Sequence, residues 1–189
     1  MDLGKSCLTL GDLKTIWKPG SAVKNWKAIG AGFNDLPLSL AGAGSQSGTY
    51  DFFNEEILGK GADGKPLPSR QDYSASEDDN VTVNVVKAAK AGLGYFGFSY
   101  FEENQDSLTA LGVDGGDGCV VPSAGTITDE SYPLARPLFI YAKKASLDKP
   151  EVKGFVRYFL ENATALANDQ KFVPAPQADL DAGLAKIPA

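Results

Sequence analysis

Apolar residues recur at helical spacing in several stretches of the chain. The clearest stretch begins at Pro150, a residue that suits the first turn of a helix. Its apolar positions follow an i, i+3, i+4, i+7, i+8 series: Val152, Phe155, Val156, Phe159 and Leu160. We therefore predict a helix over about residues 150–167. Similar patterns predict helices after the capping box Thr9–Asp12, over 49–58, from the acids at 77–79 to Lys90, over 100–108, as one turn at 122–127, and over 177–186.

Short apolar runs between turn residues predict strands. These runs lie at 36–40, 93–98, 109–113, 119–121 and 136–143. The valines at 81–86 also favour a strand weakly, but the acids before them and the lysines after them match a helix macrodipole. Because strands alternate with helices and no repeat occurs, the predicted fold class is α/β.

Composition and charge exclude several kinds of function. The chain has 189 residues and a net charge of −6, with no basic run, so nucleic acid and anionic membranes are not expected partners. It has no histidine, which removes Ser–His–Asp and Cys–His catalytic sites and histidine-bound metals. Two cysteines cannot form a four-cysteine zinc site. The acids at 77–79 lack the spacing of a calcium loop and are interpreted as solvated capping charges.

The loop Gly42–Thr49 is the strongest candidate for chemistry. It is rich in glycine and serine and lies between the predicted strand at 36–40 and the helix at 49–58. A helix end of this kind presents backbone N–H groups and positive charge to an anion, and Ser45, Ser47 and Thr49 add hydroxyl donors. The spacing alone favours an N-capped helix without any ligand, because serine and threonine are common helix caps.

Four motifs resemble one known family. They are the loop Gly44–Phe53, the stretch Ser69–Asn80, the segment Gly92–Phe98, and Ser131–Tyr141. Their residues and order are similar to those of phosphate-binding proteins, the extracytoplasmic receptors of the high-affinity ABC phosphate transporter. The resemblance implies one lobe of a type II periplasmic-binding-protein fold, a mixed sheet flanked by helices. It further implies that residues 1–135 form the phosphate-binding second lobe, and that residues 136–189 supply a returning strand and helices that dock on an absent first lobe.

The start of the chain differs from that of the family. Residues 1–4 have no apolar signal core, and no apolar run reaches membrane-spanning length. We therefore expect an extracytoplasmic protein represented without its signal segment and first lobe; a natural short protein is the alternative. In an exported relative of these receptors Cys7 and Cys119 would form a disulfide, whereas in a cytosolic chain they would be two unrelated thiols.

The resemblance also implies the site residues. Ser47, Gly48 and Thr49 match the family's phosphate turn, and Ser45 is a further candidate donor. Where some relatives carry an arginine the chain has Ala43, so we expect Arg70 to supply a guanidinium, unless it forms a structural pair with Asp72.

Gln46 stands where other relatives have an acid that accepts a proton from the ligand. The sequence therefore supports binding of an anion more firmly than selectivity for phosphate over other anions.

The expected function follows from these residues. We expect a receptor that binds inorganic phosphate and delivers it to an ABC transporter permease, with no cofactor, no metal and no enzymatic activity. The alternatives are an anion- or phosphoester-binding domain without a transport role, a structural domain that has lost its ligand, and an enzyme that uses the Ser47 loop as an oxyanion cradle. The enzyme is disfavoured because no histidine exists and no lysine lies near the loop to act as a base.

Overall fold

The computed structural model describes residues 2–188, which form two compact units. The N-terminal unit runs to Pro122 and takes in Tyr132–Leu134, whereas the C-terminal unit comprises Ser123–Ser131 and the chain from Ala135 onward. The strands are β1 (Cys7–Thr9), β2 (Ser39–Ala43), β3 (Ser74–Ser76), β4 (Gly92–Gly94), β5 (Gly112–Asp114) and β6 (Cys119–Val120). The α-helices are α1 (Leu10–Trp17), α2 (Gly48–Leu58), α3 (Asp79–Ala88), α4 (Phe98–Glu102), α5 (Ala124–Thr128), α6 (Pro150–Glu161), α7 (Ala163–Asp169) and α8 (Gln177–Leu184).

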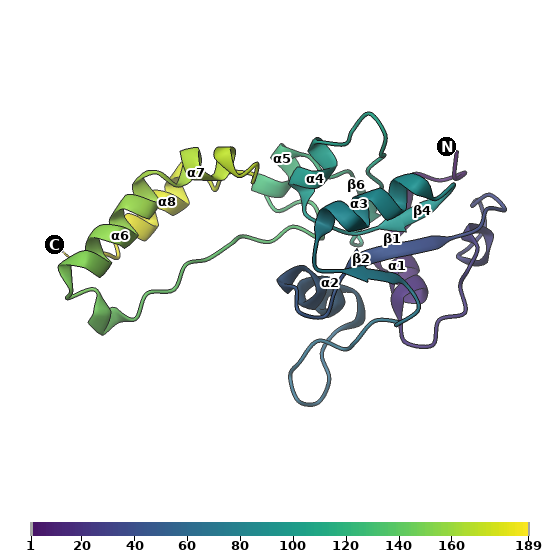
Figure 1. Ribbon diagram of the computed structural model, residues 1–189, viewed down its shortest axis with the longest axis horizontal. Coiled ribbons are helices and arrows are strands. Elements are labelled where there is room, and N and C mark those ends of the chain that lie inside the picture. Colours follow the sequence, from purple (N-terminus) through teal and green to yellow (C-terminus); the bar gives the residue numbers. More distant parts are fainter. Residues whose placement is uncertain (1, 189) are drawn as a thin grey trace. The chain divides into compact units, whose positions relative to one another are not determined.

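Two three-stranded sheets organise the N-terminal unit. In one, the parallel strands lie in the order β3-β2-β4, with Ala43 opposite Ser76 and Ala41 opposite Gly94. In the other, β1 and β5 are parallel and β5 and β6 are antiparallel. Figure 1 shows α3 on one side of the β3-β2-β4 sheet and α1 and α2 on the other, and the last four residues of β2 are accordingly buried. The predicted α/β class is confirmed.

Helix α1 follows β1 directly and contributes buried side chains to the core. The predicted capping box is confirmed, because the Thr9 hydroxyl accepts the Asp12 N–H and the Asp12 carboxylate accepts the Thr9 N–H, each at 3.0 Å. Trp17, at the end of α1, is 1 % exposed. Its ring meets those of Phe53, Tyr73 and Tyr95 edge-on, at centroid distances of 5.0 to 5.4 Å. This aromatic cluster ties α1 to α2, to the residue before β3 and to the residue after β4.

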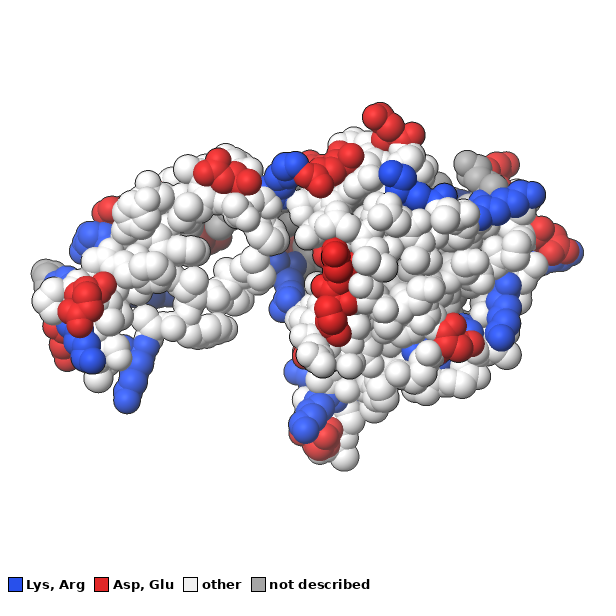
Figure 2. Space-filling model, viewed as in Figure 1, with Lys and Arg blue, Asp and Glu red and all other residues white. Residues whose placement is uncertain are grey.

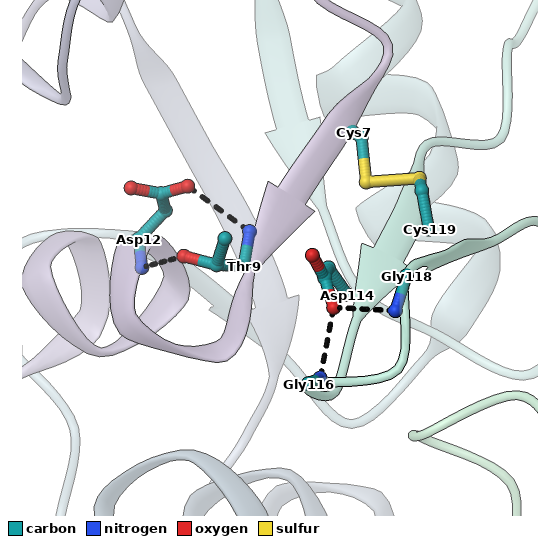
Figure 3. The surroundings of a disulfide bond; sticks show 7 residues. All are labelled: Cys7, Thr9, Asp12, Asp114, Gly116, Gly118 and Cys119. Carbon is teal, nitrogen blue, oxygen red and sulfur yellow. Dashed lines mark hydrogen bonds between the residues drawn. A yellow bond between two sulfur atoms is a disulfide. The ribbon is translucent and has the colours of Figure 1, made fainter.

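The predicted disulfide is confirmed and lies in the β1-β5-β6 sheet (Figure 3). Cys7 and Cys119 have Cα atoms 6.1 Å apart and are separated by 112 residues. The bond spans β5 at Gly112, where a side chain would collide with the Cys119 Sγ. The turn between β5 and β6 is closed by Asp114, whose Oδ1 accepts the N–H groups of Gly116 and Gly118 at 2.8 and 3.1 Å.

Several predicted elements differ from the observed ones. The predicted strand at 36–40 begins later, at Ser39, and the strand at 93–98 is only β4, after which Phe98 starts α4. The prediction of one helix over 150–167 is wrong, because the chain breaks at Asn162 between α6 and α7.

The strand predicted at 136–143 is also wrong. This segment does not pair with another strand among the described residues. Its apolar side chains are largely exposed: the exposed fractions of Leu138, Phe139, Ile140 and Tyr141 are 68, 66, 45 and 91 %. A strand requires a neighbouring strand to take its backbone hydrogen bonds.

The C-terminal unit consists mainly of helices. Within it α6 packs beside α8 (Figure 1), where Leu160 approaches Gly183 and Leu180 is buried. No helix among residues 2–188 is both long and apolar enough to cross a membrane. The predicted division at residue 135 stays a prediction.

Candidate anion-binding site

The loop at 44–47 connects the central strand β2 to the start of α2. Its first residue is fixed to the sheet, because the Gly44 N–H donates to the Ser76 carbonyl at 2.8 Å. The Ser47 N–H then donates to the Gly44 carbonyl at 3.1 Å, which closes a tight turn. The loop therefore leaves the carboxyl end of a buried parallel strand and enters a helix, the arrangement in which α/β sheets bind ligands.

Ser47 caps the helix. Its Oγ accepts the Thr49 N–H at 3.1 Å, and its carbonyl accepts the Asp51 N–H at 3.2 Å. The predicted cap is thus present. A hydroxyl that accepts a bond still carries its own hydrogen, so capping leaves Ser47 able to donate to a ligand. Ser47 and Thr49 are half-buried and Gly48 is exposed, so the helix end is open to solvent.

The two residues at the tip of the loop, Ser45 and Gln46, are exposed. The Gln46 N–H is not directed to solvent: it donates to the Glu77 Oε1 at 3.1 Å. Glu77 follows β3 directly, and its carboxylate lies over Gly44, where any side chain would collide with it. The loop therefore already holds one negatively charged group of the protein.

Two tyrosines support the carbonyl that precedes the loop. The hydroxyls of Tyr73 and Tyr95 both donate to the Ala43 carbonyl, at 2.8 and 3.4 Å. The Tyr95 ring stacks on Phe53 of α2 with centroids 3.8 Å apart. Burial is the main cause that raises the pKa of each phenol above its usual range, so both remain protonated donors near neutral pH. These contacts hold the end of β2 and the middle of α2 in fixed relation.

The three acids that were interpreted as capping charges separate into different roles. Asp78 is the N-cap of α3 and accepts the Asn80 N–H at 2.9 Å, as predicted. Asp79 is half-buried and faces the Gly97 N–H, and burial raises the pKa of its carboxyl. Glu77 alone of the three bonds to the loop. Sequence reasoning missed that contact because it joins positions 31 residues apart.

Arg70 is bonded elsewhere. Its Nε and Nη2 donate to the two Asp72 carboxylate oxygens at 2.6 and 2.8 Å, and its Nη1 donates to the carbonyls of Ile16 and Val23. The Arg70 side chain is 3 % exposed. The hydrogen bond from Arg70 is the main cause that lowers the pKa of Asp72 to about 2. The alternative prediction of an Arg70–Asp72 pair is confirmed, and a phosphate contact by Arg70 has no geometric support.

The arrangement suits an anion held by neutral donors. It offers the positive end of an 11-residue helix and the hydroxyls of Ser45, Ser47 and Thr49. Residues 2–188 contain no group of three or more His, Cys, Asp or Glu that could hold a metal ion. Acidic and basic side chains are interspersed over the face seen in Figure 2, so neither sign dominates it.

Two curated relatives share most of this chain. Protein SphX of Synechococcus elongatus is 44 % identical over 154 residues, which are 80 % of this chain and 44 % of the relative. The phosphate-binding protein PstS of Staphylococcus epidermidis is 37 % identical over 174 residues, which are 90 % of this chain and 50 % of the relative. The chain spans about half the length of the curated relatives it matches.

Two solved structures share the fold. One is the crystal structure of a possible phosphate binding protein from Planctomyces limnophilus, with a TM-score of 0.82 and 37 % identity over 97 % of this chain and 66 % of that one. The other, from Clostridium perfringens, is named for a phosphate ABC transporter substrate-binding protein and holds bound phosphate. Its TM-score is 0.63, with 25 % identity over 91 % of this chain and 64 % of that one. The lobe fold implied by the sequence resemblance is therefore confirmed.

The family itself is established by a match that covers most of the chain. Residues 2–163 match PBP_like_2, which is described as a PBP superfamily domain. This match includes β2, the loop and α2, and it extends through α6. The chain belongs to the PBP superfamily.

Proposed function

We propose that this chain binds inorganic phosphate at the N-terminus of α2 and acts in phosphate uptake by an ABC transporter, without catalysing a reaction. The observation that carries this proposal is the sequence Ser47-Gly48-Thr49 opening α2 directly after a buried central strand. Relatives that cover most of the chain are named phosphate-binding proteins, which supports the choice of ligand. The disulfide supports an extracytoplasmic location, because such bonds persist in oxidising compartments.

The proposed donors are Ser45, Ser47, Gly48 and Thr49. The hydroxyl groups can turn toward an oxyanion, and the absence of a side chain at Gly48 lets the backbone approach a phosphate oxygen closely. Arg70 stays outside this donor set because Asp72 and two backbone carbonyls take its N–H groups. Its part in the proposal is to hold the end of α1 in place.

A second part of the proposal concerns the C-terminal unit. We infer that residues 136–189 dock on a lobe that lies outside this chain, whereas residues 1–135 carry the phosphate loop. A groove of about 410 Å³ supports docking; its lining includes Ile140, Tyr141, Phe155 and Phe159. Contiguous exposed apolar side chains are typical of an interaction site. The greater length of the curated relatives leaves room for such a lobe.

This chain alone should bind phosphate weakly. Four charge-assisted hydrogen bonds of roughly 1.5–3 kcal/mol each give about 6–12 kcal/mol gross. Association costs of about 4–15 kcal/mol cancel most of that gain. We expect a dissociation constant of about 1 mM or weaker, equivalent to about −4 kcal/mol. A docked second lobe that closes over the ligand should tighten binding, because it lowers the local dielectric constant.

Titration calorimetry with phosphate, sulfate and a phosphoester tests the proposal. Ser47→Ala or Thr49→Ala should weaken phosphate binding by about 1.5–3 kcal/mol. The matched control is Ser123→Ala, which removes the N-cap serine of α5. Unchanged affinity in the Ser47 and Thr49 variants, with only a lower melting temperature, would mean that these residues cap the helix and do nothing more. Preference for the phosphoester would favour an anion-binding domain without a role in phosphate transport.

A further inference from the structure

The carboxylate of Glu77 has no role in the proposed function and yet contacts the same loop. Its Oε1 accepts the Gln46 N–H at 3.1 Å, within the loop that is proposed to bind phosphate. The carboxylate also lies against Gly44, in space that a side chain at that position would occupy. Backbone pairing keeps it there, because Ser76 pairs with Ala43 and accepts the Gly44 N–H.

The charge of Glu77 is not neutralised by a salt bridge in the described part of the chain. The ion pairs found there join Lys24 and Arg70 to Asp72, Lys27 to Asp35, Lys60 to Glu55, and Arg157 to Glu161. The next two residues in the chain, Asp78 and Asp79, are themselves acidic and are engaged at α3 and at Gly97. Glu77 is thus an unneutralised negative charge bonded to the loop that opens α2.

An oxyanion held by Ser45, Ser47, Gly48 and Thr49 would lie beside this charge, because the Gln46 N–H that Glu77 accepts lies between the first two of these donors in the chain. Both groups are hydrogen-bond acceptors, and both are favoured by the positive end of α2. Two negative charges a few ångströms apart repel each other, by about 1 kcal/mol for a solvent-exposed group such as Glu77. The two anions therefore cannot both gain the full stabilisation that the loop offers.

We propose that the Glu77 carboxylate is a built-in competitor of the bound oxyanion, which holds the Gln46 N–H and weakens oxyanion binding by the loop. This inference rests on the proposed function, since it concerns the same site. It predicts that the loop binds the oxyanion less tightly than its donor groups alone would permit, and so releases it more readily. It also assigns a role to Gly44, which must lack a side chain for the carboxylate to reach the loop.

The variant E77Q tests this inference, because glutamine keeps an acceptor oxygen for the Gln46 N–H and removes only the charge. The control is E56Q, which removes the same charge from the exposed surface of α2, in the half of the helix remote from the loop. Binding of phosphate and of sulfate would be followed by the amide NMR signals of residues 44–49 in each protein. The full chain is used in every case.

We expect E77Q to bind both anions about fivefold more tightly than the unaltered chain, the effect of one unit-charge repulsion across about 4 Å of water. The gain should shrink at high ionic strength, and E56Q should show little gain. Unchanged affinity in E77Q would show that Glu77 only braces the loop. A loss confined to phosphate would show that Glu77 accepts a proton from the ligand; either result overturns the inference. If neither the unaltered chain nor E77Q binds phosphate or sulfate, even at ligand concentrations well above millimolar, the proposed phosphate site is wrong as well.

Discussion

The two units of this chain differ sharply in the exposure of their apolar side chains. The N-terminal unit buries its large side chains: Ile16 and Trp26 are fully buried, and Trp17 and Leu8 nearly so. The C-terminal unit exposes many of its own, and Phe155 and Tyr158 of α6 are 66 and 61 % exposed. Both units contain amphipathic segments, so the difference lies in whether a partner surface is present for each apolar face.

This difference suggests that the two units have different roles. The loop that is proposed to bind phosphate needs fixed geometry, and the N-terminal unit provides it through a paired sheet, an aromatic cluster and a disulfide. The C-terminal unit lacks such a core around its segment 136–143. We interpret it as the part that gains stability by docking elsewhere.

Removal of the disulfide should have the largest effect. Replacement of Cys7 and Cys119 by serine should cost the N-terminal unit about 4–5 kcal/mol, on the chain-entropy estimate for so long a closed loop. Hydrogen exchange measured on β1 and β5 should accelerate, whereas exchange in α6 should not change. Equal acceleration in α6 would show that the two units share one stability and would remove the contrast.

Truncation of a large apolar side chain should have the next largest effect on stability, and the loss should differ between the two units. Trp17→Ala should destabilise the N-terminal unit by about 3–5 kcal/mol, because it deletes a fully enclosed ring and leaves a cavity. Phe155→Ala should cost less than about 1 kcal/mol, since most of that ring is already in contact with water. Chemical denaturation followed by tryptophan fluorescence, with α6 exchange as a second readout, measures both. A loss for Phe155→Ala as large as that for Trp17→Ala would contradict the exposed placement of α6.

The smallest expected effect concerns acid pH. The pKa of Asp72 is lowered to about 2 by its hydrogen bond from Arg70, so the pair stabilises the fold above the unfolded carboxyl's pKa near 4. That stability is lost as the pH falls from about 4 toward 2. The carboxylate is 52 % exposed, so solvent screening limits the contribution to about 1 kcal/mol.

Unfolding measured between pH 2 and pH 6, at about one-unit steps, checks this prediction. Asp72→Asn should flatten the acid limb of the stability curve. The matched control is Asp35→Asn, whose carboxylate lies 3.7 Å from Lys27 with both side chains well exposed. An acid limb that is as steep in the Asp72 variant as in the unaltered chain would refute the assignment.

Local signals in the sequence predicted the helices of both units well. The Thr9–Asp12 capping box and the Ser47 cap are decided within one helical turn, so the sequence alone locates the starts of α1 and α2. Pro150 and the apolar series that follows it locate the start of α6. The break at Asn162 was missed because helical spacing continues across it.

Pairing between distant residues could not be read in the same way. β3 is the sequence Ser-Ala-Ser, which has no strand signal of its own and becomes a strand only through its register with β2. The apolar run at 138–141 has a strong strand signal and yet forms no strand, since the described chain offers it no neighbour. The contact of Glu77 with the loop depends on the same β2–β3 register, and so no local pattern indicated it.

Amide NMR of the unaltered chain shows whether phosphate binds at the start of α2. Phosphate added to millimolar concentration should shift the amide signals of Ser45–Thr49 more than any others, with the Gly48 signal among the largest. The amides at the start of α5, after the N-cap Ser123, should hardly move, because that five-residue helix has no glycine–serine loop before it. Shifts centred on α5 or the C-terminal unit, or no shift at Ser45–Thr49, would contradict phosphate binding at the start of α2.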